Sequence, residues 1–163
     1  MSKLNHFGDL KFNTNNGKFI VRSAGFLISS DSVLLHRKDC DDFWAIIGGK
    51  VTEYESSIDA VKREFLEELD MEVQVDRLLW IIENFYTLNS VKCHELQFVY
   101  LLTSENVPAT NDELSDRYGE ENDLVLKWFE LDNLMSIDCR PKAVFNQDEL
   151  IPSEIKHLVC FDD

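Results

Sequence analysis

The chain has 163 residues, of which 44% are apolar and 11% aromatic, so it can bury a hydrophobic core and does not read as a disordered protein. With 31 acidic and 16 basic residues its formal net charge is −15, which opposes binding to a nucleic-acid duplex or an anionic membrane, because both need a basic surface. A small phosphorylated substrate whose charge is masked by cations remains compatible with this charge.

The first half of the chain predicts three strands followed by a helix. The strand segments are rich in β-branched and aromatic side chains, and a glycine pair and a loop follow the third of them. Ser56 or Ser57 is a suitable N-cap, and the helix is expected to end at Leu69. The predicted strands are 18–30, 33–37 and 43–47.

The second half of the chain is again rich in strand-like segments. An acidic connection at 104–123 interrupts them, and connections of this length in compact domains are usually functional or mobile. A short helix is expected at 132–137 and a last helix at 152–158. No repeat or linker divides the sequence, so we expect one mixed α/β (α+β) domain over 1–163. The predicted strands are 71–75, 78–88, 92–102 and 124–131.

The beginning of the chain and its cysteines bear on its cellular setting. The segment MSKLNHFGDL has no apolar signal core, and no apolar run reaches transmembrane length, so we expect a cytoplasmic protein. None of the cysteines forms the close pair typical of a zinc site. Reduced and mostly buried thiols are therefore expected at Cys40, Cys93, Cys139 and Cys160.

The predicted helix has an acidic face beside its apolar stripe. Because a helix turns by roughly 100° per residue, Glu64, Glu67 and Glu68 share one face. Either this face is solvated, as charge runs usually are, or a cation neutralises it. Repulsion of a few tenths of a kcal/mol per pair, roughly, does not decide between these interpretations. The apolar stripe comprises Ile58, Val61, Phe65 and Leu69.

The spacing of the residues around the acidic face decides between a solvated face and a face that binds a cation. Its positions are Gly49, Glu55, Arg63, Glu64, Phe65, Glu67, Glu68 and Met71. This pattern resembles the signature of the Nudix hydrolases, G-x5-E-x7-R-E-U-x-E-E-x-G-U, where U is a bulky apolar residue. The resemblance implies a single Nudix domain with an α/β/α sandwich around a mixed β-sheet.

Two positions depart from the usual Nudix pattern. Asp70 stands where the signature has glycine, at a helix end that favours a left-handed backbone, which aspartate tolerates better than most residues. Ile47 replaces a proline often found before the glycine pair, which is expected to loosen the loop without removing a chemical group.

The resemblance implies that Glu64, Glu67 and Glu68, with the carbonyl of Gly48, hold divalent cations. Clustered carboxylates suit Mg²⁺, with Mn²⁺ as a substitute. Such ions would neutralise a diphosphate and lower the pKa of a water molecule that attacks phosphorus. The segment that matches the signature, residues 49–71, is called here the Nudix box. The resemblance implies that its orienting and structural positions are Gly49, Glu55 and Arg63.

The general base stays open among several carboxylates. Members of the family draw it from the box, which here means Glu64, or from a later loop, where Glu120 and Glu121 are the candidates. Glu95 is a further candidate because its strand could point it towards the site. His94 beside it is interpreted as a structural or surface histidine.

Substrate contacts are expected from cations and aromatic rings, each of which also has a plainer interpretation as surface charge or core. The cations that could bind phosphates are Arg22, Arg37 and Lys38. The rings that could stack on a nucleobase are Trp44, Phe85 and Tyr86.

The sequence therefore predicts a Mg²⁺-dependent pyrophosphohydrolase for a nucleoside diphosphate linked to another moiety. An ordinary or oxidised nucleoside triphosphate, ADP-ribose and a nucleotide sugar all fit, and a homodimer stays open. The alternative is a catalytically silent Nudix-fold module that binds a nucleotide or a partner, which loss of box carboxylates would have favoured. A Ca²⁺ buffer is disfavoured because the twelve-residue loop of alternating oxygen ligands is missing.

Overall fold

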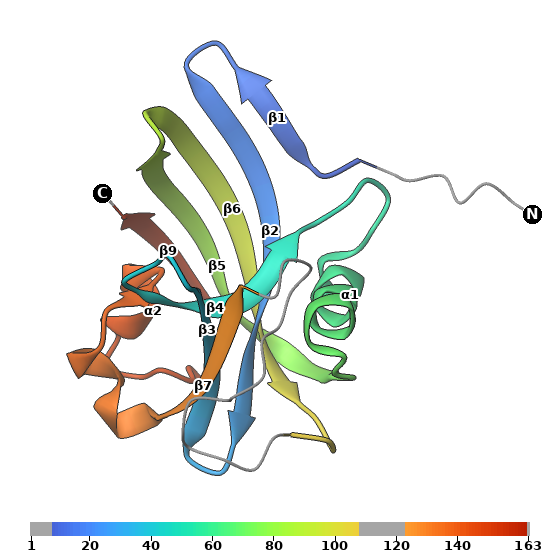
Figure 1. The fold of residues 1–163 in the computed structure, drawn as a ribbon, viewed down its shortest axis with the longest axis vertical. Coiled ribbons are helices and arrows are strands. Elements are labelled where there is room, and N and C mark those ends of the chain that lie inside the picture. The colour runs from blue at the N-terminus through green and yellow to red at the C-terminus, as the bar shows by residue number, and fades with distance from the viewer. Residues whose placement is uncertain (1–7, 108–122, 163) are drawn as a thin grey trace, which may run out of the picture.

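The computed structural model describes residues 8–107 and 123–162, and within them no helix is long and apolar enough to cross a membrane (Figure 1). The fold is mixed α and β, as predicted. The helices are α1 (Ser57–Leu69), α2 (Lys142–Phe145) and the 3-10 helix η1 (Leu131–Ser136). The strands are β1 (Lys11–Thr14), β2 (Gly17–Ser29), β3 (Ser32–Lys38), β4 (Trp44–Lys50), β5 (Gln74–Leu88), β6 (Val91–Thr103), β7 (Leu124–Glu130), β8 (Cys139–Arg140) and β9 (Lys156–Phe161).

The described strands form one mixed sheet with the order β7-β3-β4-β2-β6-β5-β9, in which β1 also pairs with β2 and β8 with β4. Strand β2 is its centre. It pairs in parallel with β6 on one side, and in antiparallel with β1 and then β4 on the other. The carboxyl-terminal strand β9 is an edge strand that runs parallel to β5. This order brings β4, β2, β6 and β5 side by side.

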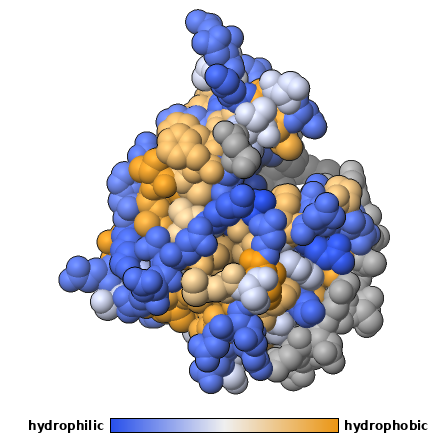
Figure 2. Space-filling view, turned by 90° about the vertical axis from the view of Figure 1, so that its left-hand side faces the viewer, coloured by the Kyte–Doolittle hydropathy of each residue, from blue (hydrophilic) through white to orange (hydrophobic). Residues whose placement is uncertain are grey.

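Helical elements lie on both sides of the sheet. Helix α1 packs on one side, and η1 and α2 cover the other (Figure 1). Figure 2 views the molecule from the side that lies on the left in Figure 1, and it shows apolar surface between hydrophilic residues there. One apolar cluster joins α1 to the sheet through Leu27, Val61, Phe65 and Leu102. The second joins the sheet to the other helices through Phe26, Trp80, Leu134 and Phe145.

The ends of α1 are fixed by its own sequence. The Ser56 hydroxyl accepts a hydrogen bond from the Asp59 backbone N–H at 3.0 Å, which confirms the predicted N-cap. At the other end Asp70 adopts the left-handed conformation, with φ at 51°, and donates its N–H to the Leu66 carbonyl. The aspartate thus forms the turn for which the signature has glycine.

Two predicted elements and one predicted packing contact are wrong. Residues 152–158 do not form a helix. The segment KHLVCF, which begins at Lys156, pairs with β5 as strand β9. Residues 71–73 are not part of a strand but belong to the connection before β5, in which Met71 and Val73 are buried. Ile58 is 42% exposed rather than packed on the sheet, and Ala60 is the buried residue of that turn.

The glycine pair lies inside strand β4, whereas the strand was predicted to end at Ile47, before the pair. Gly48 pairs with Ala24 of β2, and a Cβ at Gly48 would lie only 2.3 Å from the Ser23 carbonyl oxygen. Glycine is therefore needed here so that β2 and β4 can approach each other. Strand β1 was not predicted at all, because its four residues are all exposed and carry no burial pattern.

Candidate active site

The Glu64 side chain lies directly against the glycine pair. A Cβ added at Gly49 would lie 2.1 Å from the carboxyl carbon of Glu64, so only glycine leaves room for the acid. The Glu64 side chain is 12% exposed, whereas that of Glu67, one turn further, is 60% exposed. The close packing of α1 on β4 thus buries one box carboxylate against the strand backbone.

The acidic face of α1 is organised by Arg63. Its guanidinium donates to Glu55 at 2.6 and 3.0 Å, to Glu64 at 2.8 Å and to Glu67 at 3.1 Å. A further bond at 3.0 Å reaches the Lys50 carbonyl at the end of β4. One arginine therefore joins three carboxylates and ties the helix to the strand.

Burial and pairing set the charges of this network. Burial raises the pKa of Glu55, but hydrogen bonds from Arg63 and Thr52 outweigh it and leave the pKa below its ordinary value. Burial also raises the pKa of Glu64, and there the contact with Arg63 offsets only part of the increase. The hydrogen bonds that Arg63 donates to Glu55 raise the pKa of the Arg63 guanidinium. A further cation beside Glu64 would therefore stabilise its charged form.

A cavity of about 610 Å³, called here the catalytic cavity, opens beside these acids. Both carboxylates and cationic side chains line it, so it can hold an anionic group together with a metal ion. Its lining includes these residues predicted for the site: Arg22, Arg37, Lys38, Gly48, Gly49, Arg63, Glu64, Glu67 and Glu68.

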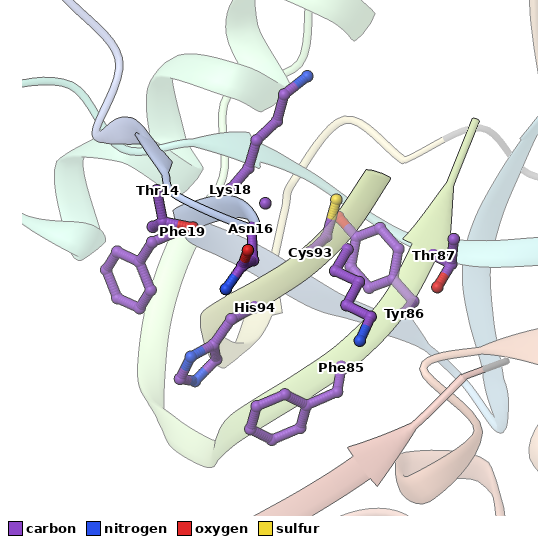
Figure 3. A pocket seen from close by; sticks show the side chains of 11 residues that line it. Thr14, Asn16, Lys18, Phe19, Phe85, Tyr86, Thr87, Cys93 and His94 are labelled. Atoms are coloured by element: carbon purple, nitrogen blue, oxygen red, sulfur yellow. The ribbon is translucent and has the colours of Figure 1, made fainter. Parts of the chain in front are cut away.

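Other predicted residues lie elsewhere. Phe85 lines a separate hollow of about 540 Å³, where it stacks on His94 with 4.4 Å between ring centroids (Figure 3). Trp44 packs edge-on against Phe129 of β7 and beneath the Arg37 guanidinium. Glu95 lies on the floor of a cavity next to the catalytic one. The candidate bases Glu120 and Glu121 fall outside the described residues.

Some residues of the site have no counterpart in the prediction. His36 and Phe43 also line the catalytic cavity, and Asn84 and Gln97 are buried polar residues of the neighbouring one. In the sequence, Asn84 and Tyr86 are separated by one residue, as are Glu95 and Gln97. That alternation places such side chains on one face of a strand and was the available signal.

The acids suit a hard divalent cation in their chemistry. Carboxylate oxygens are the ligands that Mg²⁺ and Mn²⁺ prefer. In the described parts of the chain, no three acidic, histidine or cysteine side chains stand close enough together to enclose an ion. The residues fit the ion, and substrate oxygens or water would have to complete its shell.

Comparison with protein families gives one match. The model of the NUDIX domain matches residues 19–153, which include β4, α1 and the whole catalytic cavity except Asp9. The chain belongs to the NUDIX family. This confirms the family predicted from the box, and it supports the predicted class of pyrophosphohydrolase.

Solved structures agree with the Nudix fold, whereas no curated protein matches the chain. A NUDIX hydrolase from Nitrosomonas europaea is 15% identical with a TM-score of 0.59, over 92% of this chain and 82% of that one. A UDP-X diphosphatase is 19% identical with a TM-score of 0.61, over 85% and 66%. An ADP-ribose pyrophosphatase from Streptococcus suis is 16% identical with a TM-score of 0.50, over 86% and 98%. At these identities the likeness shows the fold alone.

Neither departure from the Nudix pattern disturbs the described site. Asp70 completes the turn after α1, and Ile47 is fully buried in the core between α1 and the sheet. Gly48 and Gly49 keep their close contacts with Ala24 and Glu64.

Proposed function

We propose that this Nudix chain is a Mg²⁺-dependent pyrophosphohydrolase that cleaves a nucleoside diphosphate linked to another moiety. The observation that carries the proposal is the catalytic cavity of about 610 Å³, which the box carboxylates line together with cationic side chains. Nucleoside triphosphates, ordinary or oxidised, ADP-ribose and nucleotide sugars share the diphosphate that such a cavity would take.

The residues that would hold the metal are Glu64, Glu67, Glu68 and the carbonyl oxygen of Gly48. When bound, Mg²⁺, or Mn²⁺ in its place, supplies charge neutralisation for the diphosphate and a more acidic water. Arg63 positions the acids, because it holds Glu64 and Glu67 on one side and Glu55 on the other.

The chain's own side chains orient the substrate and take the proton. Arg22, Arg37 and Lys38 bind and align the phosphates through charge-assisted hydrogen bonds. Within the box, Glu64 accepts the proton of the attacking water at a carboxylate oxygen, because it lies in the cavity lining. Glu120 and Glu121 are the alternative bases. The anhydride P–O bond breaks, leaving a nucleoside monophosphate and a phosphorylated remainder.

The test of this function is product release from a substrate panel with and without Mg²⁺. The panel contains nucleoside triphosphates, oxidised nucleotides, ADP-ribose, nucleotide sugars and dinucleoside polyphosphates. Metal-dependent release from one class supports the hydrolase and identifies the substrate. A folded protein that shows no turnover, but whose melting temperature rises with a nucleotide, would instead support the silent binding module.

The variant Glu68→Gln tests the assignment of the site. It keeps the shape of the side chain but removes a metal-binding charge, so we expect kcat/KM to fall by at least ~100-fold with the fold intact. The increase in melting temperature on adding Mg²⁺ should shrink in parallel. Glu72→Gln is the matched control, because Glu72 is an exposed acid beyond the end of α1. Unchanged turnover in Glu68→Gln would show that the site is misassigned.

A further inference from the structure

A second cavity continues the catalytic one. It has a volume of about 520 Å³ and lies between β5, β6 and the segment before α2. We call it the side cavity. The two cavities share five lining residues: Arg22, Lys38, Asp41, Phe43 and Ala45. A molecule whose phosphates lie in the catalytic cavity can therefore extend into the side cavity.

The floor of the side cavity is a row of buried polar side chains. Asn84, Glu95 and Gln97 are only 6%, 5% and 4% exposed, and they line the cavity from adjacent strands. Asn84 and Glu95 are directly opposite each other in the β5–β6 pairing, so their side chains are on the same face. Burying polar groups costs free energy unless hydrogen bonds compensate for it.

Compensation within the described chain is incomplete. The Asn84 side-chain oxygen has no hydrogen-bond partner there, although its amide nitrogen donates to Asp162 at 3.3 Å. The Arg22 Nε group likewise has none, since the Glu95 carboxylate is 3.9 Å away. Glu95 is held by the Tyr86 hydroxyl, which donates to its Oε2 at 3.1 Å. The floor thus holds a carboxylate fixed by Tyr86 beside a buried amide oxygen that has no hydrogen-bond partner in the described chain.

The rest of the side cavity combines apolar and charged walls. Its apolar lining is Phe43, Ala45, Ile46, Leu88 and Pro141, and its charged lining is Arg22, Lys38, Asp41, Arg140 and Asp162. Apolar surface with converging polar groups is typical of sites for small organic ligands, in which the polar groups set orientation and specificity. The Glu95 carboxylate and the Asn84 amide oxygen are hydrogen-bond acceptors, so they would pair with donors on a ligand.

We propose that the side cavity selects the uncharged end group of the substrate, and that Glu95 with Asn84 reads two neighbouring N–H or O–H donors on it. This rests on the proposed function for the placement of the diphosphate. Two sources supply such a donor pair: the N–H edge of a purine base, or the adjacent hydroxyls of a sugar. Because Tyr86 acts by holding Glu95, it is a positioning residue.

The experiment compares substrates that differ by one donor, using the full chain with Mg²⁺. Guanosine and inosine nucleotides with the same phosphate chain test the base, because only guanosine carries the exocyclic amino group. A UDP-sugar and its 2-deoxy analogue test the sugar. We expect the wild-type chain to prefer the donor-bearing substrate at least ~10-fold in kcat/KM in one of the two comparisons.

Glu95→Gln should remove most of that preference, leaving it within ~3-fold, mainly by raising KM for the donor-bearing substrate. Glu83→Gln is the matched control, since Glu83 lies on the opposite face of β5 and pairs with His94 and His157. It should leave the preference unchanged. Tyr86→Phe removes one hydroxyl and guards against a Glu95 variant that does not fold; it should raise KM by ~3- to 10-fold.

The outcomes separate this inference from the proposed function. A preference that survives in both Glu95→Gln and Tyr86→Phe, or wild-type rates that are equal in both comparisons, would overturn it. If the wild-type chain shows no turnover at all, calorimetry of the same ligands in EDTA replaces kinetics. Donor-dependent binding that Glu95→Gln abolishes would then support the side cavity although the hydrolase proposal fails, and donor-independent or undetectable binding would overturn both.

Discussion

The two faces of the β5–β6 hairpin differ in chemistry although their residues alternate along the same two strands. One face carries Asn84, Tyr86 and Glu95 towards the side cavity. The other carries Phe85 and His94, which stack on each other outside both cavities. Adjacent residues therefore have separate roles, and a shift of one position along a strand exchanges them.

The aromatic face continues across five strands. In register, Phe12 of β1 pairs with Phe19 of β2, Phe19 with His94, His94 with Phe85, and Phe85 with Phe161 of β9. Ring centroids are 5.3 Å apart for Phe19 and His94 and 5.1 Å apart for Phe85 and Phe161. Cross-strand pairs of this kind stabilise a sheet. We therefore expect the face with Asn84, Tyr86 and Glu95 to control activity, and the aromatic face to control stability.

The largest effect is expected from Gly49→Ala on the catalytic side. Its Cβ would lie 2.1 Å from the Glu64 carboxyl carbon, so the acid must move away from the strand. We expect kcat/KM to fall by at least ~100-fold, as for a displaced metal ligand. Gly8→Ala is the matched control, because no atom lies within 4 Å of its added Cβ. Activity close to wild type in Gly49→Ala would break the assignment of activity to this side.

A pH titration of stability asks whether the cavity side also contributes to folding. Burial, and then the nearby Arg22 and Lys38, lower the pKa of His36 from 6.5 to about 4. The unfolded chain therefore binds this proton more tightly, and the free energy of unfolding should fall as pH decreases from about 6.5 to about 4, by up to about 3 kcal/mol. Above that range the contribution of the neutral imidazole is fully present.

Urea unfolding at about pH 7, 5.5 and 4.5 measures this effect. His36→Gln cannot titrate, so its free energy of unfolding should vary less over the same interval. Equal pH dependence in the two proteins would show that other groups cause the acid sensitivity.

The smallest effect is expected on the aromatic face. Phe85→Ala removes the central ring of the row and should lower the free energy of unfolding by about 1–2 kcal/mol. Because Phe85 lines neither the catalytic nor the side cavity, kcat/KM should stay within about twofold of the wild type. Urea unfolding and steady-state kinetics on one preparation measure both. A large loss of activity with unchanged stability would show that the aromatic face controls activity rather than stability.

Local chemistry made the box predictable from the sequence. The spacing of Glu55, Arg63 and Glu64 is contained in one loop and one helix, and the caps at Ser56 and Asp70 follow from residue type. The roles of neighbouring strand residues were not predictable in this way. Whether Phe85 or Tyr86 faces a cavity depends on which face of β5 is covered, and pairing with β6 and β9 decides that.

Burial from distant segments explains the other differences. Strand β9 exists because β5 offers it a free edge, and the sequence near 152–158 does not reveal that partner. In the sequence, Asn84, Glu95 and Gln97 look like ordinary exposed polar residues, and only the pairing of the strands shows that they are buried in a row.

The parallel pairing of β2 with β6 has a consequence for how the chain folds. Gly17 pairs with Lys92 and Leu27 with Leu102, so β2 gains this partner only after α1 and β5 have been synthesised. Contacts between segments far apart in sequence slow folding, because a long loop must close before they form. On the ribosome, the glycine pair and the acidic helix therefore emerge well before β6, the strand that pairs with β2 in the sheet beneath them.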